Sequence, residues 1–141
     1  MKWITEENLV LCAIQDYPFE ANGLLNNFCP IPFTHSRRKK RQRQIVYTSK
    51  KDYEFIKKCN STIQFHSHPL IRKDAKKLYS KLSKEDKEQM KKGTIEVVVS
   101  LAPFKVSGDL GKGITGKLKG YHYIIRAFKK NGKIEEVELY R

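Results

Sequence analysis

Two histidines one residue apart follow a short apolar run and stand directly before a proline, in the order His66, Ser67, His68 and Pro69. Side chains alternate between the two faces of a strand, so both imidazoles would lie on one face and reach one ion. Asp86, in a Ser-x-x-Asp that opens a polar helical pattern, offers a carboxylate oxygen. Two imidazole nitrogens and one carboxylate oxygen form the open ligand set of catalytic zinc sites, in which water takes the fourth position. The spacing therefore predicts a metal site made by His66, His68 and Asp86.

Each part of this pattern also has a simpler interpretation. An H-x-H sequence in a strand is more often an ordinary pair of histidines than a metal site when nothing else is known. Ser83 and Asp86 have the spacing of a helix capping box, with Ser83 at the N-cap and Asp86 at the third helical position. The two interpretations are compatible, because an acid in the first turn can cap its helix and still offer an oxygen to a metal.

Hydrophobic periodicity and turn residues predict the elements that must position these side chains. Helices are expected over Thr5 to Asp16, Ser49 to Cys59, Asp74 to Leu82, and Ser83 to Lys92, where Gly93 stops the last one. The segment Phe19 to Leu25 is expected to lead into a strand that breaks at Pro30 and Pro32. Further strands are expected over Gln44 to Thr48, Ser61 to Phe65, Thr94 to Leu101, Lys119 to Phe128 and Lys133 to Tyr140. The glycine-rich segment Ser107 to Gly116 is expected to be a loop, and Asn131-Gly132 is a hairpin signal. This order predicts an α/β fold, a mixed sheet with helices against it.

The length and composition suit one domain. The chain has 141 residues, of which 39% are hydrophobic, so we expect a single domain over residues 1–141. The segment Met1 to Glu7 lacks the apolar stretch of a signal peptide, and the apolar stretch Ile95 to Phe104 is too short to span a bilayer. Three cysteines without C-x-x-C spacing argue against a disulfide framework or a thiolate zinc site. We therefore expect an intracellular, cytoplasmic protein without a membrane partner.

A strong positive charge indicates a second kind of surface. Lysine and arginine outnumber aspartate and glutamate by 29 to 15, which gives a formal net charge of +14. Such a charge favours phosphate backbones or an acidic protein partner. The basic run begins with Arg37, Arg38, Lys39 and Lys40, which form a candidate partner or nucleic-acid surface, although an exposed loop is an equal interpretation. The run has no interleaved aromatic residues for base stacking, so its contacts would be with phosphate or an acidic protein.

The combination of these motifs resembles the JAMM (MPN+) metalloproteases. The resemblance rests on His66-Ser67-His68-Pro69, on Ser83-x-x-Asp86, and on Glu20 within the upstream segment Pro18-Phe19-Glu20-Ala21-Asn22-Gly23-Leu24-Leu25. It extends through the apolar segment Glu96 to Ser100 to the closing strand that contains Gly120-Tyr121-His122-Tyr123. The family resemblance implies the cytidine deaminase-like α/β fold.

The resemblance also implies roles for the matching residues. The two histidines and the aspartate of the family hold zinc, which corresponds here to His66, His68 and Asp86. The upstream glutamate acts on the catalytic water, which corresponds to Glu20, and the serine helps stabilise the tetrahedral intermediate, which corresponds to Ser83. The family hydrolyses peptide or isopeptide bonds. We therefore expect a zinc-dependent, deubiquitinase-like isopeptidase that cleaves after the C-terminal glycine of a ubiquitin-like or sulfur-carrier-like modifier.

This sequence departs from the family pattern at one place. Thirteen residues, Leu70 to Leu82, separate Pro69 from Ser83, which is several more than is usual in the family. Asp86 is the leading candidate for the third ligand, and Asp74 is the second candidate. The rival function is a non-catalytic MPN-like scaffold or a nucleic-acid-associated module that works through the basic run.

Overall fold

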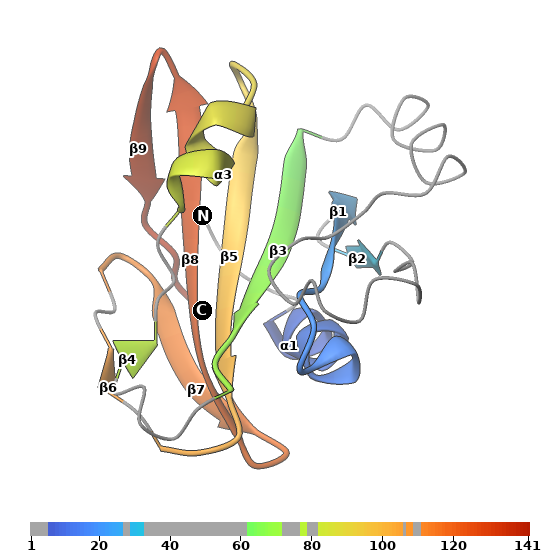
Figure 1. The fold of residues 1–141 in the computed structure, drawn as a ribbon. Helices are drawn as coiled ribbons and strands as arrows, with labels where there is room; N and C mark the ends of the chain where they lie inside the picture. Colours follow the sequence, from blue (N-terminus) through green and yellow to red (C-terminus); the bar gives the residue numbers. More distant parts are fainter. Residues whose placement is uncertain are drawn as a thin grey trace.

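Most of the described chain belongs to one mixed sheet. The computed structural model describes residues 6–26, 29–32, 62–71, 77–78, 82–105, 107–108 and 111–141 (Figure 1). The helices are α1 (Glu6–Asp16) and α3 (Lys84–Gln89). The strands are β1 (Asn22–Asn26), β2 (Cys29–Pro32), β3 (Ile63–Pro69), β4 (Lys77–Leu78), β5 (Ile95–Ala102), β6 (Ser107–Gly108), β7 (Ile114–Leu118), β8 (Tyr121–Asn131) and β9 (Lys133–Val137). Among the described residues, no helix is long and apolar enough to cross a bilayer.

The sheet contains seven strands in the order β2-β1-β3-β5-β8-β7, with β9 also paired to β8. Only β3 and β5 are parallel to each other, and the remaining pairs of this sheet are antiparallel. The long strand β8 pairs with β5 on one side, while β7 and then β9 pair along its other side (Figure 1). The expectation of an α/β fold with a mixed sheet is thereby confirmed.

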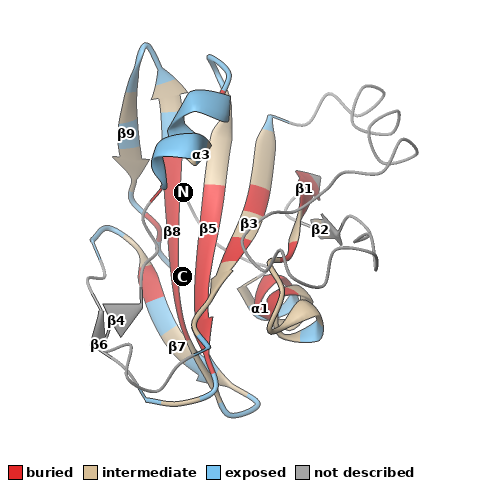
Figure 2. Ribbon diagram, viewed as in Figure 1, coloured by how far each residue is buried: buried red, intermediate tan, exposed pale blue. Residues whose placement is uncertain are grey.

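Strand β5 is buried on both faces and divides the core into two parts. Val97, Val99 and Leu101 pack with residues of α1, whereas Val98 packs with Leu82 and Met90 at the two ends of α3. Because alternate residues of a strand face opposite sides, the two helices cover opposite faces of the sheet. The buried positions form a continuous band through β5 and β8 (Figure 2). A near-continuous apolar run, such as the one in this strand, is typical of a strand that is covered on both faces.

Helix α1 forms where the sequence predicts it. Glu6 and Glu7 lie in its first turn, where negative charge is favourable beside the exposed backbone N–H groups. Leu9, Val10 and Ala13 are buried against the sheet. The helical spacing of these three residues therefore places them on one face of α1, and this face packs on the core.

The sequence predicts that Pro30 and Pro32 break the strand, but both prolines are paired in the sheet. Strand β2 contains both Pro30 and Pro32, which lie opposite Leu25 and Gly23 in an antiparallel pair with β1. Among the described strands, β2 is at the end of the sheet order. Proline is tolerated in such a strand because its missing N–H can be on the side away from the neighbouring strand.

The predicted helix Ser83 to Lys92 is correct in its start and wrong in its end. Helix α3 ends at Gln89, and Met90 has an extended backbone, with φ −68° and ψ 131°. Burial of the Met90 side chain draws the chain toward the sheet, where the Met90 carbonyl accepts a hydrogen bond from Lys130 Nζ at 2.9 Å. Gly93, with φ +84°, therefore serves a turn before β5 rather than the helix end.

The segment between the histidines and α3 also differs from the prediction. Residues 77–78 form β4, which pairs in parallel with β6 in a separate two-stranded sheet, so the helix predicted over Asp74 to Leu82 is wrong at these positions. Long-range pairing here overrides the local preference of a lysine-rich segment for helix. The expected loop Ser107 to Gly116 likewise contains β6 and the start of β7.

The C-terminal hairpin agrees with the sequence. Strands β8 and β9 are joined at Asn131 and Gly132, and Gly132 has φ +86°, which favours glycine. A second tight turn, with positive φ at Lys119 and Gly120, joins β7 to β8. Three other predictions, the strand Gln44 to Thr48, the helix Ser49 to Cys59 and the candidate ligand Asp74, lie outside the described residues.

Strand β1 is attached to β3 by a buried side-chain hydrogen bond as well as by the sheet. The N–H of Ala21 donates to Ser67 Oγ at 2.7 Å, and the N–H of Ser67 donates to the Ala21 carbonyl at 2.8 Å. Both residues are at most 1% exposed. This pair of bonds fixes the chain just after Glu20 against the residue between the two histidines.

We expect Ser67→Ala to lower the free energy of unfolding by about 1–3 kcal/mol, because the buried Ala21 N–H loses its acceptor. Ser100→Ala is the matched control, since Ser100 is equally buried in the next strand but its hydroxyl has no hydrogen-bond partner among the described residues. That control should be neutral or slightly stabilising. Urea unfolding of the two variants tests this difference, and equal effects would contradict the role of the Ser67 hydroxyl.

Candidate metal centre

Strand β3 presents the two histidines on one face of the sheet, as the spacing predicts. Phe65 and Ser67, which alternate with them, are buried on the opposite face. The strand lies between β1 and β5, with His66 opposite Asn22 on one side and Val98 on the other. Pairing on both sides holds the backbone of His66 in place, and His68 pairs with Ser100 of β5, so both rings project from a fixed backbone.

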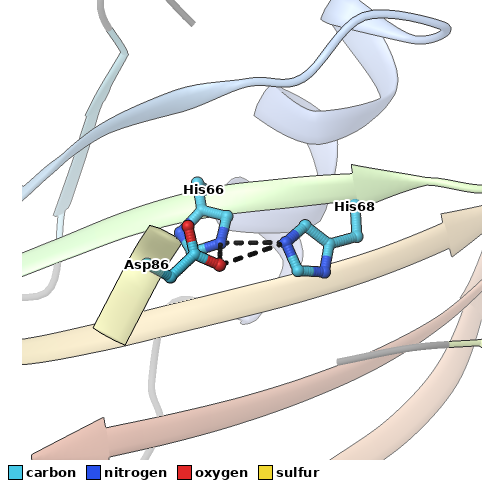
Figure 3. Close-up of side chains that lie close together, drawn as sticks. All are labelled: His66, His68 and Asp86. Atoms are coloured by element: carbon cyan, nitrogen blue, oxygen red, sulfur yellow. Dashed lines mark hydrogen bonds and ion pairs between the residues drawn. The ribbon is translucent and has the colours of Figure 1, made fainter. Parts of the chain in front are cut away.

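Three potential ligand atoms converge above this face (Figure 3). His66 Nε2 lies 3.0 Å from His68 Nε2 and 3.2 Å from Asp86 Oδ2. His68 Nε2 lies 3.6 Å from the same Asp86 oxygen. These side chains are 12%, 22% and 23% exposed for His66, His68 and Asp86, so the group is accessible from solvent. The arrangement can hold a metal ion.

The capping box of α3 positions Asp86. Ser83 Oγ accepts a hydrogen bond from the Asp86 N–H at 3.0 Å, and the Ser83 N–H donates to Asp86 Oδ2 at 2.9 Å. The same Oδ2 atom faces both histidines. The same carboxyl group of Asp86 therefore takes part in the capping box and in the candidate ligand group, so both interpretations of Ser83-x-x-Asp86 agree with the structure.

Glu96, on β5, binds the other side of the His66 ring. Its Oε1 lies 2.5 Å from His66 Nδ1, and its side chain is 16% exposed. Burial opposes the charged form of His66, but the hydrogen bonds and charges of Asp86 and Glu96 outweigh it and raise the pKa of His66 to about 10. Burial also opposes the ionised form of Asp86, but His66, His68 and the Ser83 N–H hold the pKa of Asp86 well below its usual range. Asp86 and Glu96 thus both favour a protonated His66 ring.

Glu20 lies within electrostatic range of this group. Burial raises the pKa of Glu20 to about 8, and the charge of Asp86 adds to this shift while that of His66 opposes it. Glu20 directly precedes Ala21, which is bonded to Ser67 between the two histidines. The structure therefore brings Glu20, His66, His68, Ser83 and Asp86 to one end of the β1–β3 pair and the start of α3.

Sequence reasoning missed two residues that support the site. The sequence could have indicated a role for Glu96, because Glu96 is the one charged residue in the apolar run from Ile95 to Leu101. Ser67 gave no signal apart from its place between the histidines. The basic residues Arg37, Arg38, Lys39 and Lys40 lie outside the described residues.

Comparisons with protein-family models, with curated proteins and with solved structures give no match to this chain. The chemistry of the site is therefore inferred from its own residues and from the resemblance of its motifs.

We expect a bound divalent metal in wild-type protein and a sharp loss of affinity in Asp86→Asn. The loss should exceed about 100-fold, because removing a ligand costs more than the 10–100-fold typical of an outer partner. The amide oxygen of asparagine can still accept the Ser83 N–H, and Ser83 remains the N-cap, so folding should be retained. Glu85→Gln is the matched control, because it removes one charge from the adjacent exposed residue of the same turn. Elemental analysis and titration with Zn²⁺ and Co²⁺ measure the effect, and equal affinities in the two variants would contradict the ligand assignment.

Metal binding at pH 7 is expected to release protons. His66 is protonated below its raised pKa of about 10, and a metal needs its neutral nitrogen, so affinity should rise as pH rises toward 10. Asp86 is already ionised and contributes no proton. Glu20, with a pKa of about 8, releases part of a second proton when a cation lowers that pKa. Calorimetry in buffers of different ionisation enthalpy should give about one to two protons for wild type and about one for Glu20→Gln. A binding enthalpy that does not depend on the buffer would contradict this assignment.

Proposed function

We propose that the protein is a zinc-dependent peptidase of the JAMM type that hydrolyses the bond after the C-terminal glycine of a ubiquitin-like or sulfur-carrier-like modifier. The observation that carries the proposal is the triangle of His66 Nε2, His68 Nε2 and Asp86 Oδ2, with sides of 3.0, 3.2 and 3.6 Å. A cluster of this kind beside a half-buried glutamate is the arrangement expected of a hydrolytic metal site.

The donor set and its dimensions fit zinc. Nitrogen and oxygen ligands lie about 2.0–2.2 Å from zinc, so two ligands of a tetrahedral site are about 3.4 Å apart. The three distances lie close to this value on either side. Two neutral imidazoles and one carboxylate leave one position open for catalysis. In such a site zinc supplies Lewis acidity, which lowers the pKa of water from 15.7 to about 7 and polarises a carbonyl oxygen.

Glu20 is the proposed general base and acid. Burial raises the pKa of Glu20 to about 8, and a nearby cation would lower this pKa and favour the carboxylate. The carboxylate takes a proton from the attacking water as the new carbon–oxygen bond forms. It then gives this proton to the leaving amine as the carbon–nitrogen bond breaks. A group whose pKa lies near the working pH is suited to both transfers.

Ser83 has a structural role that is compatible with its proposed catalytic one. Its hydroxyl oxygen accepts the Asp86 N–H, and the hydroxyl hydrogen is then available for donation. A donor at this place beside the ligand group would stabilise negative charge on the substrate carbonyl oxygen. Ser83 is exposed, so a substrate can reach it.

The substrate class follows from the resemblance and from charge. An extended C-terminal tail can add as a strand beside a sheet edge near the site. A modifier with an acidic surface would be attracted by a protein of net charge +14. The rival function, a non-catalytic or nucleic-acid-associated module, is supported by the same charge and by a basic run that lies outside the described residues.

Glu20→Gln is expected to lower cleavage by about 10²–10⁴-fold, which is the usual contribution of general acid–base catalysis. Zinc content should stay near that of wild type, because Glu20 is not a proposed ligand. The assay uses ubiquitin-like and sulfur-carrier-like modifiers that carry a short peptide after the C-terminal glycine. Glu85→Gln serves as the charge control and should retain activity.

Two outcomes would contradict the proposal. Full activity of the Glu20→Gln variant would remove Glu20 from the mechanism. Zinc-loaded wild-type protein that cleaves no modifier in the panel, but binds nucleic acid with an affinity that falls steeply as salt rises, would favour the rival function.

A further inference from the structure

The His66 ring is held from both sides by different acids. Its Nε2 faces His68 and Asp86, whereas its Nδ1 lies 2.5 Å from Glu96 Oε1. A neutral imidazole carries one proton on one of its two nitrogens, and the partner of one nitrogen decides the state of the other. Both carboxyl groups can accept a proton from the ring, but Glu96 lies 2.5 Å from Nδ1 whereas Asp86 lies 3.2 Å from Nε2, so the shorter contact favours the proton on Nδ1. That state leaves the Nε2 lone pair directed at the other two ligand atoms.

Sheet register explains how Glu96 reaches this position. In the parallel pair of β3 and β5, Glu96 lies opposite Gln64, and the residue opposite His66 is Val98. Because alternate residues share a face, Glu96 and His66 project on the same side, offset diagonally by two residues. A glutamate side chain is long enough to cover this offset. The contact thus depends on the pairing of two central strands and not on a flexible loop.

The burial of Glu96 indicates that the contact is specific. The Glu96 side chain is 16% exposed and that of His66 is 12% exposed, although Glu96 stands in an otherwise apolar run. A charged side chain in such a place is costly unless it has a partner. Among the described residues, His66 is the side chain that forms a hydrogen bond with the Glu96 carboxyl group.

We infer that Glu96 is a positioning residue of the metal centre, which holds His66 in the Nδ1-protonated form and fixes the direction of its Nε2. This inference rests on the metal-binding part of the proposed function and is independent of the peptidase reaction. Glu96 is not one of the three candidate ligands and acts through His66. Its carboxylate also increases the electron donation of the ring, which strengthens binding of a divalent cation.

A purely structural role for Glu96 makes a different prediction. The hydrogen bond between His66 and Glu96 joins two central strands, so its loss would destabilise the fold under either role. Only the positioning role changes metal affinity in protein that remains folded, and only that role changes which His66 nitrogen carries the proton. The experiment therefore reads affinity and proton position and uses unfolding only as a control.

The affinity test compares Glu96→Ala, Glu96→Gln and the control Glu85→Gln by Zn²⁺ titration against a chromophoric chelator. Glu96→Ala should bind zinc about 10–100-fold more weakly than wild type, which is the usual effect of removing such a partner. Glu96→Gln should lie between, because its amide oxygen still accepts the Nδ1 proton but carries no charge. The affinity of Glu85→Gln should stay close to wild type. If Glu96→Ala does not fold, Glu96→Gln, which has nearly the same shape, carries the test.

The second test is nitrogen NMR of the histidine rings in zinc-loaded protein. Wild type should show a slowly exchanging His66 Nδ1–H, which should persist in Glu96→Gln and be lost or exchange rapidly in Glu96→Ala. The corresponding signal of His68 is the internal control. Wild-type affinity in both Glu96 variants, together with an unchanged His66 signal, would overturn the inference.

The outcome also separates this inference from the proposed function. Wild-type protein that binds no zinc would remove both. Wild-type protein that binds zinc but cleaves no modifier would remove the peptidase proposal alone, and the effect of Glu96→Ala on affinity would still decide the role of Glu96.

Discussion

The alternation of side chains along β3 is the constraint on which the rest of the site depends. Phe65 and Ser67 face the core that α1 covers, and His66 and His68 face the opposite side. A shift of one residue in register would exchange the two sets and bury both imidazoles. Seven parallel partner pairs with β5 and the Ser67 bond to Ala21 oppose such a shift. One strand thus carries the core, the attachment of β1 and both nitrogen ligands.

The second constraint is the balance of charge around the histidines. Acidic side chains from three separate segments, Glu20 before β1, Asp86 on α3 and Glu96 on β5, surround His66. Asp86 and Glu96 raise the pKa of His66, because a proton on its ring compensates their negative charge. A divalent cation would take over this function without a large rearrangement, because the three ligand atoms already lie within 3.6 Å of one another. Preorganised ligands of this kind reduce the entropic cost of binding.

Features that depend on nearby residues could be predicted from the sequence. The shared face of His66 and His68, the cap made by Ser83 and the hairpin at Gly132 all follow from local periods or turn chemistry. The α/β class followed from the order of these segments. The family resemblance added Glu20, which no local rule would have connected to a site more than forty residues later in the chain.

Features that depend on register or on burial could not be predicted in this way. The contact of Glu96 with His66 exists because β3 and β5 pair in one particular alignment, which joins residues 30 positions apart. The early end of α3 follows from the burial of Met90, and the pairing of β4 with β6 is likewise a long-range interaction. In each case a tertiary contact outweighs a local preference.

The attachments on either side of the long Leu70-to-Leu82 connection have a consequence for how this protein can vary. At its start, the Leu70 N–H bonds to the Leu101 carbonyl at 2.8 Å, and the Leu70 carbonyl accepts the Tyr17 hydroxyl at 2.6 Å. At its end, Leu82 is buried beneath α3. Because both ends are anchored to the sheet independently, the length of the connection does not set the distances among the ligand atoms. Insertions and deletions there can reshape the surroundings of the site while its geometry is inherited unchanged.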